Sequence, residues 1–232
     1  MGDTSIAMTE ETARSTAMTT TDPTPNGFIL EENVVSEEIW KEIEQWMKDG
    51  KHNDNSGGSD SDDILPWERA IEGRMVCQWG VRYDYDKQCV DHTNVGPIPQ
   101  FLLSKLNVDS TEYTQCIINC YNSNDAIPYH LDDLDFGPTV VVYTFGENRP
   151  LNFRRRRRRC DSKSTSNSND SESEEYEYYT CYPNHCSKYI LSIDARYEWE
   201  HSVPEGHGYR VSITFRSMKM KWNDIQQVNV KY

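Results

Sequence analysis

Short segments in which apolar and polar residues alternate are the feature that most constrains how this chain can fold. Such alternation places the two kinds of residue on opposite faces of a β-strand. Turns rich in Gly and Asn separate the segments, as at 146–148 and 206–208. Eight short strands favour an antiparallel double sheet of the jelly-roll type. The segments predicted as strands are 74–86, 114–122, 139–146, 151–156, 176–182, 188–193, 196–203 and 209–220.

Two helices are predicted before most of these strands. In residues 31–50, apolar side chains recur at helical spacing, Ser36 is a suitable N-cap and Gly50 ends the pattern. Residues 98–106 form a second, shorter apolar pattern of the same period. The sequence therefore predicts a mainly β fold with flanking helices.

Three polar stretches cannot contribute much to a core. Hydrophobic residues make up 36% of the 232 residues, less than is usual in a globular chain. We expect residues 1–26 to form a disordered Thr-rich tail, and residues 27–232 to form one domain with polar insertions near 50–63 and 154–175.

The charge and the cysteine content limit the environment and the partners. The formal net charge is −14, which argues against a general binder of polyanions. The run of six consecutive arginines from Arg154 to Arg159 reverses this charge locally. No apolar segment is long enough to span a membrane, and seven cysteines without an export signal are expected to be reduced. We therefore expect a cytoplasmic or nuclear protein.

The last predicted strand separates polar from apolar residues by parity. Such a division is also typical of an edge strand with one face in solvent. However, Asn119 and Tyr121 share one face of another strand in the same way. The polar set in the last strand is Arg210, Ser212, Thr214 and Arg216, and the apolar set is Val211, Ile213 and Phe215.

Two histidines and an aspartate form the candidate metal site. His130 and Asp132 point the same way if the chain is extended there. In the segment "RYEWEHSV", His201 shares a predicted face with Tyr197 and Trp199. A histidine in that position is usually a core residue, but with the first two it completes the set of ligands that holds non-haem Fe(II) and leaves coordination positions open.

These residues resemble the signature of the AlkB-like dioxygenases. "HLD" at 130–132, His201 and "RVSITFR" at 210–216 are similar to the family's His-x-Asp, His and Arg-x5-Arg. The segments "INCYNSNDAIPYHLDD", "VVYTFGENRPLNFR" and "RMVCQWGVRYDY" extend the resemblance over about residues 28–220. It implies a double-stranded β-helix and an oxygenase that uses Fe(II), 2-oxoglutarate and O2. His130, Asp132 and His201 match the family's iron ligands.

The resemblance also implies which residues bind 2-oxoglutarate. Arg210 matches the arginine that pairs with the distal carboxylate of 2-oxoglutarate, and Tyr121 matches a hydroxyl donor to the same group. Asn119 and Arg216 match residues around the metal-chelating end. Ser212 matches a position that is often Asn or Ser in the family.

The implied substrate is a modified nucleobase that is demethylated or hydroxylated, with RNA favoured slightly over DNA. Trp79, Tyr83 and Tyr85 are candidates for stacking on an unpaired base, although three aromatic residues of one parity can equally be core. Arg74 and Arg82 are candidate contacts near them. The net charge favours the same chemistry on a protein side chain or a small molecule, and a non-catalytic interaction module on the same barrel is a further alternative.

A zinc site is a separate hypothesis from the cysteine pattern. Its candidate ligands are Cys160, Cys181, His185 and Cys186. Because the paired Cys-x2-Cys spacing of structural zinc sites is missing, we interpret these residues as ordinary thiols.

Overall fold

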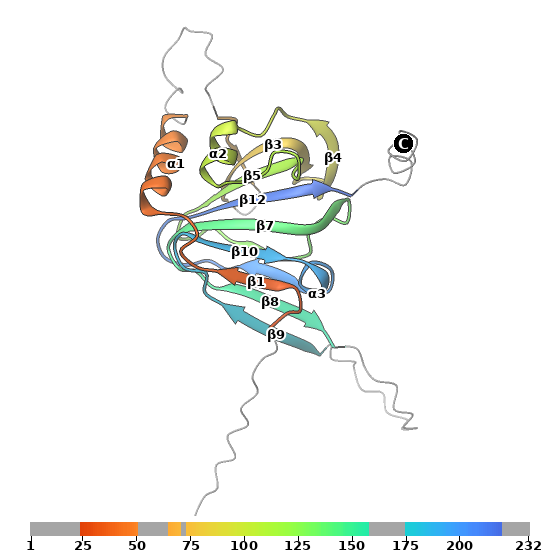
Figure 1. The fold of residues 1–232 in the computed structure, drawn as a ribbon. Coiled ribbons are helices and arrows are strands. Elements are labelled where there is room, and N and C mark those ends of the chain that lie inside the picture. The colour runs from red at the N-terminus through yellow and green to blue at the C-terminus, as the bar shows by residue number, and fades with distance from the viewer. Residues whose placement is uncertain (1–23, 51–64, 71–72, 158–174, 220–232) are drawn as a thin grey trace, which may run out of the picture.

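Two antiparallel sheets dominate the computed structural model, which describes residues 24–50, 65–70, 73–157 and 175–219 (Figure 1). The large sheet comprises β1 (Phe28–Glu31), β2 (Glu68–Arg69), β3 (Met75–Asp84), β4 (Cys89–Asn94), β5 (Gln115–Tyr121), β7 (Phe136–Gly146), β10 (Ser187–Leu191) and β12 (Arg210–Met218). The small sheet comprises β6 (Ile127–His130), β8 (Leu151–Arg156), β9 (Tyr176–Cys181) and β11 (Glu200–Val203).

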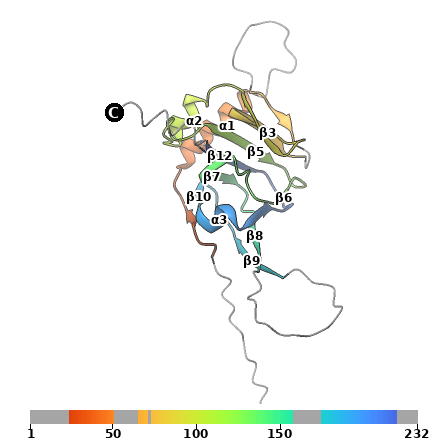
Figure 2. The same ribbon diagram turned by 90° about the vertical axis from the view of Figure 1, so that its right-hand side faces the viewer.

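The order of the strands is that of a double-stranded β-helix. In the large sheet it is β1-β10-β7-β12-β5-β3-β2, with β4 paired to β3, and in the small sheet it is β6-β11-β8-β9. The predicted mainly β jelly roll is therefore confirmed. Figure 2, turned by 90°, shows β6, β8 and β9 lying apart from β5, β7 and β12.

Two helices cover one face of the large sheet. They are α1 (Glu37–Asp49) and α2 (Gln100–Lys105), close to the two predicted helices. Ser36 caps α1 as expected, because its hydroxyl accepts a hydrogen bond from the Ile39 N–H at 3.3 Å. Buried apolar residues of both helices form one core with Val211, Ile213 and Phe215 of β12.

The opposite face of the large sheet is turned toward the small sheet. A second core lies between them and includes Tyr121, Val142, Phe153 and Trp199. Alternation along β12 therefore sends its odd-numbered residues toward the helices and its even-numbered ones toward the space between the sheets. The separation of polar from apolar residues along β12 is therefore not that of an edge strand. The strand is internal, because β5 pairs with it on one side and β7 on the other.

One strand prediction is wrong in its first half. Residues Ile193–Tyr197 form a short helix, α3, and β11 begins only at Glu200. The Arg196 N–H bonds to the Ser192 carbonyl at 3.2 Å, and the Ala195 N–H bonds to the Asn26 carbonyl at 2.9 Å. The first is a helical bond within this segment, and the second is a contact with a distant segment that overrides the local alternation. Tyr197 therefore does not share a strand face with His201. Four short strands were not predicted, namely β1, β2, β4 and β6.

Residues 1–23 of the predicted tail and much of the two insertions lie outside the described residues. Among the helices that the structure does describe, none has the length and apolar character needed to cross a bilayer.

Candidate active site

The structure brings the three candidate iron ligands together. His130 ends β6, Asp132 follows it in a loop, and His201 of β11 lies opposite His130 in the register of the small sheet. The two imidazole rings are 4.3 Å apart between centroids. Nε2 of His201 lies 3.9 Å from Oδ2 of Asp132. Although half of its strand was predicted wrongly, His201 therefore reaches the expected position.

The protonation of these groups suits a divalent cation. Burial, together with the neighbouring His130, lowers the pKa of His201 to about 3. Burial also lowers the pKa of His130. Burial alone would raise the pKa of the Asp132 carboxyl, but Arg216, His201 and His130 hold it well below its usual value. At neutral pH the site thus offers two neutral imidazoles and one carboxylate.

Hydrogen bonding orients this ligand set and leaves part of it unpaired. Nδ1 of His130 is 2.9 Å from the Pro128 carbonyl, which fixes Nδ1 as the protonated nitrogen and leaves Nε2 as a ligand atom. Oδ2 of Asp132 and Nδ1 of His201 are buried without a hydrogen-bond partner. Since buried polar atoms are normally paired, the orphaned carboxylate oxygen beside two imidazoles fits an Fe(II) ion.

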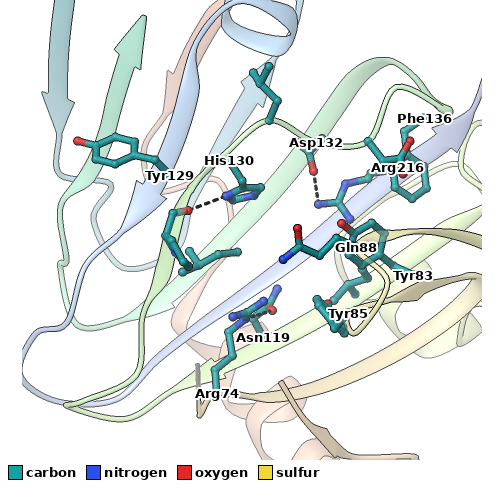
Figure 3. Close-up of a pocket in the computed structure, with 15 residues that line it drawn as sticks. Arg74, Tyr83, Tyr85, Gln88, Asn119, Tyr129, His130, Asp132, Phe136 and Arg216 are labelled. Carbon is teal, nitrogen blue, oxygen red and sulfur yellow. Dashed lines mark hydrogen bonds and ion pairs between the residues drawn. The ribbon is translucent and has the colours of Figure 1, made fainter. Parts of the chain in front are cut away.

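Arg216 lies beside the ligand carboxylate. Its Nη2 forms an ion pair with Oδ1 of Asp132, as Figure 3 shows. Its Nη1 donates to Oε1 of Gln115 at 3.0 Å, and its guanidinium carbon lies 5.1 Å from the centre of the Phe136 ring. Arg216 thus lies beside a candidate iron ligand, and its contact with the metal-chelating end of the cofactor stays a prediction.

The other residues predicted to bind 2-oxoglutarate come from two neighbouring strands. Arg210 of β12 is the cross-strand partner of Tyr121 of β5, and Ser212 is the partner of Asn119. Arg210 is 1% exposed, and Nε, Nη1 and Nη2 of its guanidinium have no hydrogen-bond partner. Its guanidinium carbon lies 5.3 Å from the centre of the Tyr121 ring, and the hydroxyl of the buried Tyr189 also lies close enough to interact with the guanidinium. A buried, unpaired guanidinium is well suited to receive a carboxylate.

Arg74, one of the candidate substrate contacts, lines the cavity but also makes contacts within the protein. It is buried, and its Nε donates to Oδ1 of Asn119 at 3.0 Å while its Nη1 donates to the Ala126 carbonyl at 3.3 Å. With Oδ1 engaged in this way, the Asn119 amide has its NH2 group left to donate. Arg74 therefore orients a residue that we expect to contact the cofactor.

A cavity of about 400 Å³ adjoins the ligand set. Tyr83 and Tyr85 of the β3–β4 hairpin form part of its wall, with ring centroids 5.2 Å apart and an edge-to-face arrangement. Its lining does not include Arg210, Tyr121, Ser212 or His201. Its lining is Arg74, Tyr83, Tyr85, Gln88, Ile117, Asn119, Ile127, Pro128, Tyr129, His130, Leu131, Asp132, Asp133, Phe136 and Arg216.

Trp79 does not belong to this wall, although it has the same parity as the two tyrosines. It is buried in the core under the helices, 6.0 Å from Trp46 between ring centroids. The reason is the backbone of Gly80, which lies between Trp79 and Tyr83 and has φ +76°. A residue in this conformation interrupts the extended backbone, so the alternation of faces does not continue from one side of it to the other. Trp79 is thus a core residue, which was the alternative interpretation of the sequence.

Arg82, the other candidate contact on this strand, is exposed and lies outside the cavity lining. Its Nη2 forms an ion pair with Oε2 of Glu68 at 3.5 Å. A different residue connects the β3–β4 hairpin to the loop that carries Asp132. The carboxylate of Asp133 in that loop accepts a hydrogen bond from the Val90 N–H at 3.1 Å.

Arg196 of α3 is a residue of the site that the sequence did not indicate. Its Nη1 donates to the Asp132 carbonyl at 2.9 Å, and its Nη2 donates to the Asp133 carbonyl at 2.6 Å. Longer bonds of 3.4 Å reach the carbonyls of Phe136 and Gly137. A single side chain thus joins the segment that leads to His201 with the loop that carries Asp132. Because the sequence predicted strand there, nothing in it indicated this contact.

The residues of the zinc hypothesis are not gathered together. Cys181 lies in the core between the sheets, whereas Cys186 lies in the core under the helices, and residue 160 is outside the described part. Glu37, His185 and Cys186 do lie within 4.8 Å of one another. However, both His185 nitrogens are engaged, by the Gly146 N–H at 2.8 Å and by Glu37 at 2.9 Å. Burial raises the pKa of Cys186 to about 11, which disfavours the thiolate that a metal requires.

Fold and site together define a class of protein, the oxygenases that use Fe(II) and 2-oxoglutarate on a double-stranded β-helix. A model of the 2OG-Fe(II) oxygenase superfamily matches residues 33–216, and the chain belongs to this superfamily. The family confirms Fe(II), 2-oxoglutarate and O2 as the cofactors and co-substrate.

Solved structures are similar to this chain. One, titled "The structure of OsALKBH1", has a TM-score of 0.52 at 15% identity and covers 84% of this chain and 98% of its own. This similarity concerns the fold. Another is a prolyl hydroxylase in complex with a hypoxia inducible factor peptide from Trichoplax adhaerens, with a TM-score of 0.49, 15% identity and coverage of 89% and 88%. Comparison with curated protein sequences gives no significant match.

Proposed function

We propose that this oxygenase binds Fe(II) through His130, Asp132 and His201 and oxidises a modified nucleobase of RNA or DNA. The observation that carries the proposal is one cavity of about 400 Å³ in which aromatic side chains face the ligand set. Fe(II) with 2-oxoglutarate and O2 supplies oxidation of a nearby C–H bond, with release of succinate and CO2. The remaining tasks fall to side chains of the chain itself.

The cofactor tasks divide between the two strands β5 and β12. Arg210 and Tyr121 receive the distal carboxylate of 2-oxoglutarate, because the guanidinium is buried and has no other hydrogen-bond partner. Asn119 directs its NH2 group toward the metal-chelating end, and Ser212 stands beside it in the register. Arg216 holds the Asp132 carboxylate in its ionised form.

The substrate task falls to the wall of the cavity. Tyr83 and Tyr85 present two rings at an angle, and the apolar side chain of Ile117 lies below them in a shared buried cluster. A flat, unpaired base can stack on such rings while its methyl group faces the iron. This arrangement supports a nucleobase more directly than an aliphatic side chain.

Protein side chains are the second candidate, favoured by charge. The chain carries −14, and Asp133 contributes a carboxylate to the cavity lining. The arginine run is also partly neutralised. Arg155 pairs with Glu177 at 2.8 Å, and Arg157 pairs with Glu175 at 2.7 Å. A basic peptide would meet less repulsion here than a polyanion.

Succinate release against methylated RNA, methylated DNA and methylated peptides tests the proposed substrate. We expect an oligonucleotide to raise the rate above that of uncoupled 2-oxoglutarate turnover. Stimulation by peptides alone would transfer the assignment to the second candidate.

Metal titration tests the ligand assignment independently of any substrate. Changing His130, Asp132 or His201 to Ala should abolish binding of Mn(II), used as an air-stable probe, while the far-ultraviolet circular dichroism stays that of the parent. His185→Ala is the matched control, because that imidazole bonds to Gly146 and Glu37. Retained metal binding by His201→Ala would remove His201 from the site.

A further inference from the structure

The outer face of the small sheet carries an unusual set of side chains. Residues of β8 and β9 alternate, so that Leu151, Phe153 and Cys181 enter the core between the sheets. Their neighbours in sequence face away from that core. Figure 1 shows β8 and β9 at the edge of the molecule farthest from α1 and α2. The outward residues of the two strands are Asn152, Arg154, Arg156, Tyr176, Tyr178 and Thr180.

Four of the side chains on this side of the sheet form a continuous row that ends at the cavity. The guanidinium carbon of Arg154 lies 4.3 Å from the ring centre of Tyr129 and 5.0 Å from that of Tyr176. The rings of Tyr176 and Tyr178 follow, 6.2 Å apart. Tyr129 precedes His130 and contributes to the cavity lining. In Figure 3 its ring points away from Asp132 and Arg216. We call these four residues the tyrosine–arginine row.

The row is both ordered and exposed. Arg154 is held in place by Glu200, whose Oε2 accepts from its Nε at 2.5 Å. Tyr178, at the far end, is 51% exposed. Large aromatic side chains on a rigid strand provide contact area at a low cost in conformational entropy. The row is therefore suited to binding rather than to packing within this chain.

The charge of this face is opposite to that of the whole protein. Among the described outward residues of β8, β9 and β11, two are arginines, Arg154 and Arg156, and one is an acid, Glu200. Their sum is one positive charge in a chain of −14. Aromatic rings interleaved with arginines bind single-stranded nucleic acid, because bases stack on the rings and the cations approach the phosphates.

We propose that the tyrosine–arginine row binds the single strand that flanks the substrate base, and that it guides this strand from β9 across β8 to the cavity at Tyr129. The inference rests on the proposed function and specifies its substrate as single-stranded nucleic acid. A duplex would not expose the faces of its bases to these rings.

Binding of an unmodified, fluorescein-labelled RNA of about ten nucleotides, within the usual site size of such surfaces, tests the row. Fluorescence anisotropy compares the parent with Tyr178→Ala, Tyr178→Phe and the double variant Tyr176→Ala/Tyr178→Ala. We expect Tyr178→Ala to weaken binding roughly tenfold, the double variant to weaken it further, and Tyr178→Phe to bind almost as the parent does. Tyr182→Ala is the matched control, because Tyr182 is 58% exposed but lies past the end of β9. Uncoupled 2-oxoglutarate turnover should be equal in all of them.

The outcomes separate this inference from the proposed function. Unchanged RNA affinity in the double variant would overturn the row as a binding surface, even if methylated RNA is oxidised. RNA binding that depends on Tyr178, without oxidation of any methylated oligonucleotide, would support the row and reject the nucleobase substrate. Loss of affinity for a basic peptide instead of RNA would overturn the assigned partner. Because Tyr178 is exposed, we expect Tyr178→Ala to fold as the parent does, and thermal unfolding checks this.

Discussion

Arg196 and Arg210 are buried to the same degree, yet the structure treats them in opposite ways. Each is 1% exposed. Arg196 donates to the carbonyls of Asp132 and Asp133, whereas no nitrogen of the Arg210 guanidinium has a hydrogen-bond partner. A buried cation without partners is unfavourable unless an anion joins it. The difference indicates that Arg196 serves the architecture of the metal site, and that Arg210 is kept for a ligand.

The same substitution at both positions should separate these roles, with the larger effect at Arg196. In Arg196→Met, the carbonyls of Asp132 and Asp133 lose their donor in a buried setting. Each unsatisfied group costs about 1–3 kcal/mol, so we expect the free energy of unfolding to fall by at least about 3 kcal/mol in urea denaturation. Arg196→Lys, which keeps a charge and three donors, should lie between this variant and the parent. Parental stability in Arg196→Met would contradict the architectural role.

The free energy of unfolding should depend on pH because of the two histidines of the metal site, which lie at the end of the site near Arg196. The folded pKa of His201 is about 3, whereas in the unfolded chain it is about 6.5. The unfolded state therefore binds more protons between these values, and stability should fall as the pH drops from about 6.5 toward 3. The lowered pKa of His130 and of Asp132 acts in the same direction.

Urea denaturation of the metal-free protein across this range measures the slope. His201→Asn, which cannot be protonated there, should show a shallower decline than the parent. Identical slopes would mean that His201 is accessible to protons in the folded chain.

At Arg210 we expect the reverse pattern of effects. Arg210→Met should weaken 2-oxoglutarate binding by about 1.5–3 kcal/mol, roughly tenfold to a hundredfold, because a charge-assisted bond to the carboxylate is lost. Its free energy of unfolding should stay equal to that of the parent or rise. Arg210→Lys should recover only part of the affinity, because a point charge does not match the carboxylate fork. Anaerobic titration with 2-oxoglutarate and urea denaturation measure the two quantities, and a large loss of stability would place Arg210 beside Arg196.

The sequence predicted the architecture and most of the site because those features repeat with a short period or lie close together in the chain. Parity placed Arg210 and Ser212 on one face of their strand and Asn119 and Tyr121 on one face of another. The register of β5 and β12 then brings the two pairs opposite each other. The two-residue step from His130 to Asp132 is equally local. In these cases the alternation of a strand carries the information.

Contacts between distant segments were beyond the reach of the sequence. The helix α3 forms where alternation predicted strand, because Ala195 and Arg196 bond to groups elsewhere in the chain. Gly80, with φ +76°, interrupts the alternation of faces within β3, so a parity argument cannot be carried from Trp79 to Tyr83. Arg74, predicted only as a candidate substrate contact, lines the cavity and also bonds to Asn119, a contact that the sequence did not indicate.

Among the aromatic residues, Trp79 and Tyr83 differ in the same way: Trp79 belongs to the core and Tyr83 to the cavity for the substrate. Substitutions of these two residues carry the smallest predicted effects. Trp79→Leu should lower the free energy of unfolding by about 2 kcal/mol, because the ring is buried against Trp46, and should leave the substrate KM unchanged. Tyr83→Leu removes a ring from the cavity wall. An aromatic contact is worth about 0.5–1.5 kcal/mol beyond its buried area, so the substrate KM should rise roughly twofold to tenfold, with 2-oxoglutarate affinity unchanged. Steady-state succinate release and urea denaturation of both variants make the comparison. A raised KM in Trp79→Leu at parental stability would reverse the two assignments and return Trp79 to the substrate site.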